Sequence, residues 1–105
     1  MGAVYNSMGQ KVGEIIYNGV YNSNGKKVGE LRYSTVVNAE GKKIGEVVYS
    51  TIYDVSGKKV GEVQYLAILN ASGTKVGEVH ELPMNPFDER DAYLRRGAAG
   101  LLLLL

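Results

Sequence analysis

The sequence predicts a mainly β fold: an antiparallel meander of long, bent strands built from a 16-residue repeat, with one C-terminal α-helix packed on or in it. Three observations predict this fold. Nearly the same phrase returns every 16 residues, as in NSNGKKVGELRYST at residues 22–35. Val, Ile and Tyr crowd each copy, which is typical of strands. Residues 84–105 abandon the repeat for a pattern with helical features.

The repeat is marked by a Gly–Glu pair that occurs five times along the chain. A strict period this short indicates one small structural unit that is repeated in space. Residues 3–11 supply the second half of one further copy. The paired residues are Gly13, Gly29, Gly45, Gly61 and Gly77, followed by Glu14, Glu30, Glu46, Glu62 and Glu78.

Each copy also contains an Asn/Asp-x-x-Gly sequence, which is typical of a hairpin tip. The short side chain of Asn or Asp can accept a hydrogen bond from the backbone ahead of it. Gly suits the fourth position because that position takes a positive φ. This is the type I turn with a bulge that is common in β-hairpins. The pattern predicts tips at residues 6–9, 22–25, 38–41, 54–57 and 70–73.

The register of these tips predicts long strands. If Asn22 pairs with Lys26, Val20 lies opposite Val28, and the alternation of side chains continues unbroken through the middle of each repeat. Each repeat is therefore expected to form one strand of about eleven residues, as at residues 28–38, which is long enough to need a bend. The tyrosines and leucines then share one face. The second face carries Val12, Val28, Val36, Ile44, Ile52, Val60, Ile68 and Val76.

A parallel β-solenoid with one repeat per rung is the alternative architecture. It would stack the repeated Glu and Lys side chains in ladders, with neighbouring strands about 4.8 Å apart. Like charges directly opposite each other destabilise a sheet, so the antiparallel meander is favoured. The meander either stays open or curls into a barrel.

A helix is expected over residues 86–104. Asn85 can cap it, and Pro86 suits its first position. Gly97 either ends the helix at Arg96 or only weakens it. One narrow apolar stripe along this helix comprises Phe87, Leu94, Ala98, Leu101 and Leu105.

This helix is expected to supply the second layer that a meander alone lacks. It would lie across the face that carries tyrosines and leucines, or inside the sheet if the sheet closes. The β-repeat region, residues 1–83, and the helical segment, residues 84–105, are therefore assigned to one domain.

Composition excludes several classes of protein. The chain has no Cys among its 105 residues, which rules out disulfides and thiolate chemistry. A net charge of +1 argues against a dedicated nucleic-acid binder. No apolar run approaches the about 20 residues of a membrane span. The first residues do not resemble a signal peptide, so a cytoplasmic location is favoured.

No group of residues indicates catalysis or a cofactor. His80 is the only His and has no neighbouring candidate ligand in the sequence. The five repeated Glu residues share similar surroundings, whereas an acid–base pair needs two different environments. We therefore expect a protein that is not an enzyme and carries no metal or cofactor.

The leading functional hypothesis is a β-repeat module for assembly or scaffolding that forms a homo-oligomer. Residues 3–6 can cover only half of the strand expected at residues 12–22, and a free strand edge recruits partners. The alternative is a glycan- or peptide-binding module that uses the tyrosine row, although such a row is more often core beneath a helix. Its candidate ligand-binding residues are Tyr17, Tyr33, Tyr49 and Tyr65.

Overall fold

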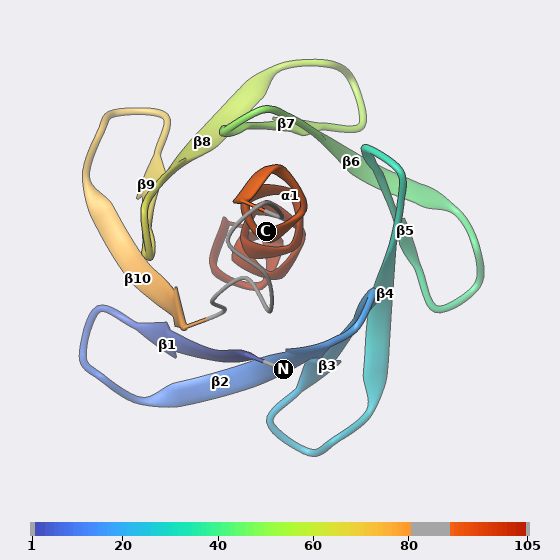
Figure 1. Ribbon diagram of the computed structural model, residues 1–105, viewed down its shortest axis with the longest axis horizontal. Helices are drawn as coiled ribbons and strands as arrows, with labels where there is room; N and C mark the ends of the chain where they lie inside the picture. Colours follow the sequence, from blue (N-terminus) through green and yellow to red (C-terminus); the bar gives the residue numbers. More distant parts are fainter. Residues whose placement is uncertain (1, 81–88, 105) are drawn as a thin grey trace.

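The computed structural model is a closed barrel of ten antiparallel strands around one central helix (Figure 1). It describes residues 2–80 and 89–104. The helix is α1, Glu89–Leu104. The strands are β1 Gly2–Asn6, β2 Lys11–Ile16, β3 Gly19–Asn22, β4 Lys27–Arg32, β5 Thr35–Asn38, β6 Lys43–Val48, β7 Thr51–Asp54, β8 Lys59–Gln64, β9 Ala67–Asn70 and β10 Lys75–His80.

The expected hairpin tips are confirmed at all five positions. At the second tip, Asn22 Oδ1 accepts hydrogen bonds from the backbone N–H groups of Asn24 and Lys26, each at 3.0 Å. The Gly25 N–H donates to the Asn22 carbonyl at 3.0 Å, and Gly25 has a φ of 79°. Neighbouring strands are antiparallel throughout, so the solenoid alternative is wrong.

The expected register is correct only next to the tip. A bulge shifts the pairing by one residue between Val20 and Tyr21, so Val20 lies opposite Gly29 and not opposite Val28. The same shift recurs in the other tip hairpins. A bulge of this kind increases the local twist, which helps a sheet of short strands to curl and close.

The expectation of one long strand per repeat is wrong, because a second turn divides each repeat. Ile16 pairs with Gly19, which leaves Tyr17 and Asn18 as a two-residue turn between β2 and β3. Equivalent turns join β4 to β5, β6 to β7 and β8 to β9. The first residue of every such turn is a tyrosine in the left-handed region. The φ values are 54° for Tyr17, 59° for Tyr33, 55° for Tyr49 and 54° for Tyr65.

The extra turn explains why the sequence suggested two apolar faces. Ile15 and Val20 would lie on opposite faces of one continuous strand, but the turn pairs them and points both side chains inward. The two expected apolar faces therefore meet inside one barrel, as when Val36 pairs with Leu31 and both side chains are buried. The largest of the fully buried side chains are Val4, Ile15, Val36, Val47, Ile52, Ile68 and Val79.

The N-terminal strand closes the ring. Val4 in β1 pairs with Val79 of β10 on one side and with Gly13 of β2 on the other. β10 belongs to the last repeat, which has no second strand of its own after it within the described residues. β1 takes the place of that second strand. Each of the ten described strands has two neighbours, so the free edge that was expected along residues 12–22 is absent.

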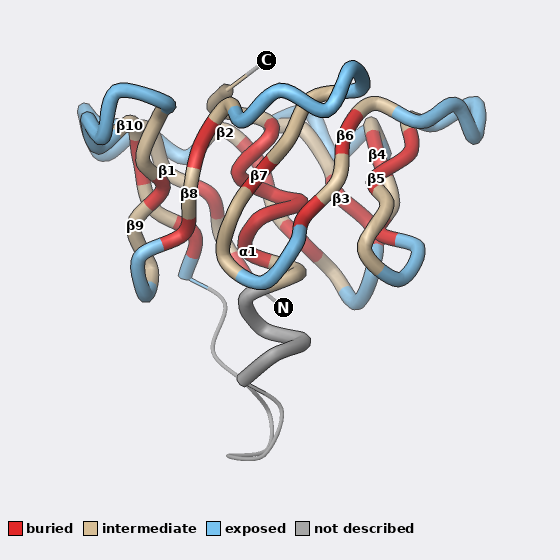
Figure 2. Tube along the Cα trace, turned by 90° about the horizontal axis from the view of Figure 1, so that it is seen from above, coloured by how far each residue is buried: buried red, intermediate tan, exposed pale blue. Residues whose placement is uncertain are grey.

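Helix α1 runs through the middle of the barrel (Figures 1 and 2). It continues through Gly97 to Leu104, so Gly97 does not end it. A Cβ built on Gly97 would lie 2.6 Å from Val47 Cγ1, and one on Gly100 would lie 2.9 Å from Ile68 Cδ1. Small residues are therefore required at these two positions, where Val47 and Ile68 of the barrel wall lie against the helix.

The helix is buried on all sides from Arg96 to Leu101, rather than along one stripe. Of the expected stripe, Leu94, Ala98 and Leu101 pack in the core. Its other members, Phe87 and Leu105, and the expected cap at Asn85 and Pro86, lie outside the described residues. No helix within residues 2–80 and 89–104 has the length and hydropathy to cross a membrane.

Candidate functional site

The two ends of the barrel carry different side chains. The Asn/Asp-x-x-Gly tips form one end, here called the lysine end. Every lysine of the chain lies there, either directly after the glycine of a tip or at the first residue of the following strand. The two-residue turns form the opposite end, here called the tyrosine end. It is defined by Tyr17, Tyr33, Tyr49 and Tyr65. Figure 2 shows exposed turns at both ends.

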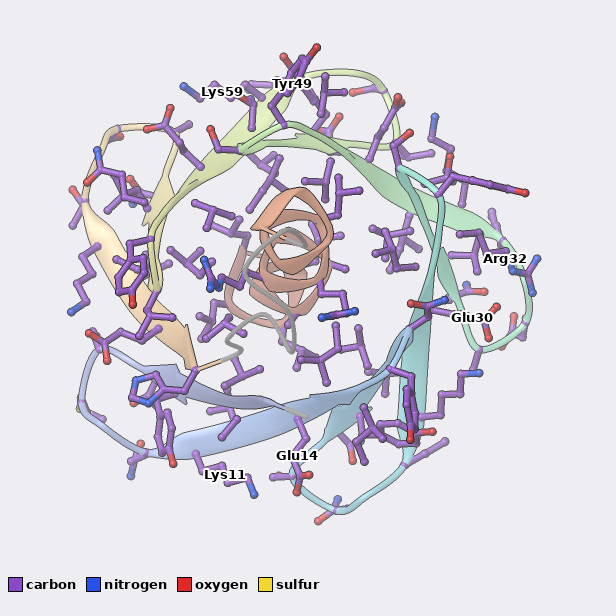
Figure 3. The ribbon with its side chains drawn as sticks, in the orientation of Figure 1. Lys11, Glu14, Glu30, Arg32, Tyr49 and Lys59 are labelled. Atoms are coloured by element: carbon purple, nitrogen blue, oxygen red, sulfur yellow. The ribbon has the colours of Figure 1, made fainter. Side chains whose placement is uncertain are left out.

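The four turn tyrosines are exposed, so the interpretation of the row as core is wrong. The exposed fraction is 97% for Tyr33, 79% for Tyr17, 77% for Tyr49 and 62% for Tyr65. They stand on turns rather than on a sheet face, and the labelled Tyr49 lies outside the barrel wall in Figure 3. The candidate binding residues are therefore accessible to a ligand.

The backbone at these tyrosines is in an unfavourable conformation. A φ near 55° suits Gly or Asn, whereas a bulky residue in this region costs roughly 1–3 kcal/mol. An exposed aromatic ring brings no compensating burial. Neither property stabilises the fold at Tyr17, Tyr33 or Tyr49, although both occur together in all four turns. Such strain is often concentrated at functional sites.

Hydrogen bonds anchor each tyrosine turn to the next strand hairpin. The carbonyl oxygen of Asn18, the second residue of the first turn, accepts a hydrogen bond from the Leu31 N–H at 2.7 Å. The carbonyl of Ser34 likewise accepts from the Val47 N–H at 2.8 Å. The turns that carry Tyr49 and Tyr65 repeat this bond. The tyrosines are thus presented by a rigid scaffold, as is common for binding loops.

A hollow of about 580 Å³ opens at the tyrosine end. It lies among three successive turns, so it draws residues from more than one repeat. Asn18 and Ser34 give it polar groups, whereas Leu31, Val47 and Leu94 give it an apolar part. The full lining comprises Asn18, Leu31, Tyr33, Ser34, Val47, Val48, Tyr49, Leu94 and Arg95. Mixed linings of this size are typical of small-ligand sites.

Tyr65 differs from the other three tyrosines because Arg96 of α1 lies against it. The Arg96 side chain is 2% exposed, and its Nη1 donates to the Tyr65 carbonyl at 3.2 Å. The guanidinium carbon lies 5.4 Å from the centre of the Tyr65 ring, within cation–π range. Tyr65 therefore takes part in joining the helix to the barrel.

The outer wall carries a repeated ion pair between each Lys that begins a strand and the Glu three residues later. Figure 3 shows Lys11 and Glu14 on the outside of the wall, as it does Glu30 and Arg32. Lys–Glu distances run from 2.6 Å to 3.6 Å. Hydrogen bonds from Arg32 and then from Lys27 lower the pKa of Glu30 to about 2. Each of these carboxylates is therefore paired with a cation on the outer wall.

His80 lies at the seam where the barrel closes. Its Nε2 is 2.8 Å from Glu78 Oε1, and its ring centre is 5.0 Å from that of Tyr5 in β1. The contact joins β10 to β1, which indicates a structural role. Within the described ranges, 2–80 and 89–104, no group of three His, Asp or Glu residues could hold a metal ion.

Comparisons of the chain with protein-family models, with curated proteins and with solved structures found no match. The function must therefore be argued from the tyrosine end itself. The sequence identified its four tyrosines as candidates, but it indicated neither their turn geometry nor the contact of Arg96 with Tyr65. The spacing of 16 residues between the tyrosines was the available signal.

Proposed function

We propose that this protein is a non-enzymatic recognition module that binds a glycan through the tyrosine end of its barrel. The proposal depends on one observation: four tyrosines are exposed on anchored turns whose backbone geometry disfavours them. Tyrosine supplies a large, rigid and amphipathic contact surface at low cost in conformational entropy, which suits recognition. The ring can stack on an apolar face, while the hydroxyl remains available for hydrogen bonds.

The distribution of charge favours a glycan over a nucleic acid. All the lysines lie at the other end, and each strand lysine is paired with a glutamate on the wall. Near the tyrosine end, Arg32 is paired with Glu30 at 2.8 Å, and Arg96 is 2% exposed against Tyr65. Arg95 lines the hollow, but one cation there is not the series of charges that a phosphate backbone requires. A nucleic-acid site would need cations beside the aromatic rings to neutralise phosphates. A neutral ligand makes no such demand.

The topology favours a glycan over an extended peptide. A peptide that adds a strand needs a free sheet edge. Every described strand already has two neighbours, so this mode has no edge to use. Sugar rings need only separate aromatic surfaces with polar groups nearby, and the tyrosine end has both.

Binding can be tested with neutral hexasaccharides: cellohexaose, maltohexaose and chitohexaose. The chain lacks Trp, and four of its eight tyrosines stand in these turns, so tyrosine emission includes a signal from the proposed site. We expect at least one of these probes to quench this emission, and we expect Tyr33→Asn to weaken its binding. Val55→Ser is a matched control, because Val55 is a 61% exposed apolar residue at the lysine end. Equal losses in both variants, or no binding by any probe, would contradict the proposal.

The hypothesis of a self-assembling scaffold stays a prediction. Its original basis was a free strand edge, and the closed ring removes that basis. A homo-oligomer would have to form through one of the two barrel ends or the charged outer wall.

A further inference from the structure

We infer that the binding surface comprises three of the four tyrosine turns, those of Tyr17, Tyr33 and Tyr49, and that it takes a neutral oligosaccharide long enough to reach from one turn to the next. This inference rests on the proposed function and assigns its residues and the length of its ligand. Tyr65 lies outside the surface.

The three turns share a residue pattern that the fourth lacks. Each tyrosine is followed by a small polar residue, Asn18, Ser34 or Ser50, whereas Tyr65 is followed by Leu66. A pyranose ring has an apolar face of C–H groups and an edge of hydroxyls. An aromatic ring beside an amide or hydroxyl matches both features, because one covers the face and the other bonds the edge.

The polar side chains in these turns remain available to a ligand. The backbone carbonyls of Asn18, Ser34 and Ser50 accept the hydrogen bonds that anchor the turns. Within the part of the chain that the structure describes, no hydrogen bond to their side chains is present. The turn is thus held by its backbone, and its side chains can bond sugar hydroxyls.

The 580 Å³ hollow connects these three turns. Asn18 from the first turn, Tyr33 and Ser34 from the second, and Tyr49 from the third all line it. The hollow therefore forms the centre of the proposed surface, with the exposed rings of Tyr33 and Tyr49 around it. One sugar unit can occupy the hollow while neighbouring units reach the adjacent turns.

Tyr65 is assigned to the structure and not to the ligand. Arg96 contacts both its carbonyl and its ring, at 3.2 Å and 5.4 Å. Its exposed fraction of 62% is also the lowest of the four. The barrel therefore presents a continuous surface over neighbouring turns, bounded on one side by a tyrosine that the helix engages.

Three similar turns on one rigid barrel favour a ligand that repeats its own chemistry. Once the first sugar unit is bound, the next binds as part of the same molecule at a high effective concentration. We therefore expect affinity to rise at least tenfold from a monosaccharide to a hexasaccharide of the same sugar. If only one turn bound the ligand, affinity would not increase beyond that of a single sugar unit.

The experiment is an NMR titration of the intact protein with glucose, cellotriose and cellohexaose, and with the corresponding maltose and chitin series. The ring protons of Tyr17, Tyr33 and Tyr49 should shift, whereas those of Tyr65 should not. Calorimetry on the variants should show a loss of at least tenfold for Tyr33→Asn and Tyr49→Asn. The matched variant Tyr65→Asn should change affinity by less than twofold.

The outcomes separate this inference from the proposed function. If Tyr65 shifts as much as Tyr33, or if the monosaccharide binds as tightly as the hexasaccharide, the three-turn surface is wrong although glycan binding stands. If no saccharide shifts any of the four tyrosines, both are wrong. The ring-proton shifts do not depend on the variants, so a variant that fails to fold leaves the test intact.

Discussion

Leu104 occupies the space that a side chain on Gly61 would need. Its Cδ1 lies 2.6 Å from the position of a Cβ built on Gly61. Successive helix residues point about 100° apart, so consecutive leucines reach different parts of the surrounding wall. Each of four leucines meets the glycine of a different repeat. The pairs are Leu101 with Gly45, Leu102 with Gly13, Leu103 with Gly77, and Leu104 with Gly61.

Gly61→Ala should destabilise the barrel by about 1–3 kcal/mol, because overpacking a close-packed core has a cost of this size. The new methyl group would meet Leu104 and also the Leu69 carbonyl oxygen, 2.5 Å away. Gly29→Ala is the matched control. Its nearest described atoms are Val37 O at 3.1 Å and Val20 Cβ at 3.8 Å. Urea unfolding should show the larger loss for Gly61→Ala, and equal losses would contradict the packing account.

Gly25→Val should destabilise the protein through the backbone alone. Gly25 has a φ of 79°, and a Cβ there would meet nothing within 4 Å. A β-branched residue in the left-handed region costs roughly 1–3 kcal/mol. Gly25→Asn should cost less, because Asn tolerates this region. Thermal melting of the two variants checks the order, and an unchanged melting temperature for Gly25→Val would mean that the turn does not need a positive φ.

The hairpin tips could be predicted from the sequence because their chemistry is local. Asn22 and Gly25 lie three residues apart, and together they satisfy the hydrogen bonds and the backbone angle of one turn. The tyrosine turns could not be predicted in this way. Tyr17 is a strand-forming residue, and the usual Asn-Gly signal at Asn18 and Gly19 stands one position after the residue that takes the positive φ.

Closure of the barrel depends on contacts that no single repeat encodes. β1 and β10 lie at opposite ends of the repeat region, and only the combined twist of five hairpins brings them together.

The role of Gly97 was ambiguous in the sequence because it also depends on distant contacts. Glycine weakens an isolated helix, but the approach of Val47 to Gly97 leaves no room for a side chain. The glycine in the helix is therefore explained by the limited space inside the barrel.

Acidification should remove the contribution of the ion pairs around Glu30. Arg32 and Lys27 lower the pKa of Glu30 from 4.5 to about 2 in the folded protein. Because this pKa lies below the unfolded value, the pairs stabilise the fold above about pH 4.5 and lose their effect as the pH falls toward 2. The carboxylate is exposed, so salt should weaken the effect further.

Urea unfolding at pH 6 and at pH 2.5 measures this contribution. Glu30→Gln should flatten the dependence of stability on pH. Glu62→Gln is the control, because within the described part of the chain Glu62 pairs with Lys59 alone, at 3.6 Å. If Glu62→Gln flattens the dependence as much as Glu30→Gln, the Arg32 contact is not the cause.

Tyr33→Asn should stabilise the fold while it weakens glycan binding. Tyr33 is 97% exposed at a φ of 59°, so its ring is buried against nothing, and Asn accepts the same backbone conformation more readily. We expect a gain of about 0.5–1 kcal/mol in unfolding free energy, in the range of other substitutions that relieve backbone strain. Tyr65→Asn should gain less, because it loses the contact with Arg96. A destabilised Tyr33→Asn variant would show that the tyrosine serves the fold.

The protein should sediment as a monomer of 11.4 kDa at micromolar concentration. The homo-oligomer expected from the sequence was to cover a free strand edge and the rows of valine and isoleucine. In the closed barrel each described strand has two neighbours, and Val36, Ile52 and Ile68 are 1% exposed or less. Sedimentation equilibrium distinguishes the monomer from the homo-oligomer. A stable oligomer would restore the assembly hypothesis, and Tyr49→Asn would then show whether the tyrosine end forms the interface. Dissociation would place the contact there, whereas an unchanged mass would place it on the charged outer wall or at the lysine end.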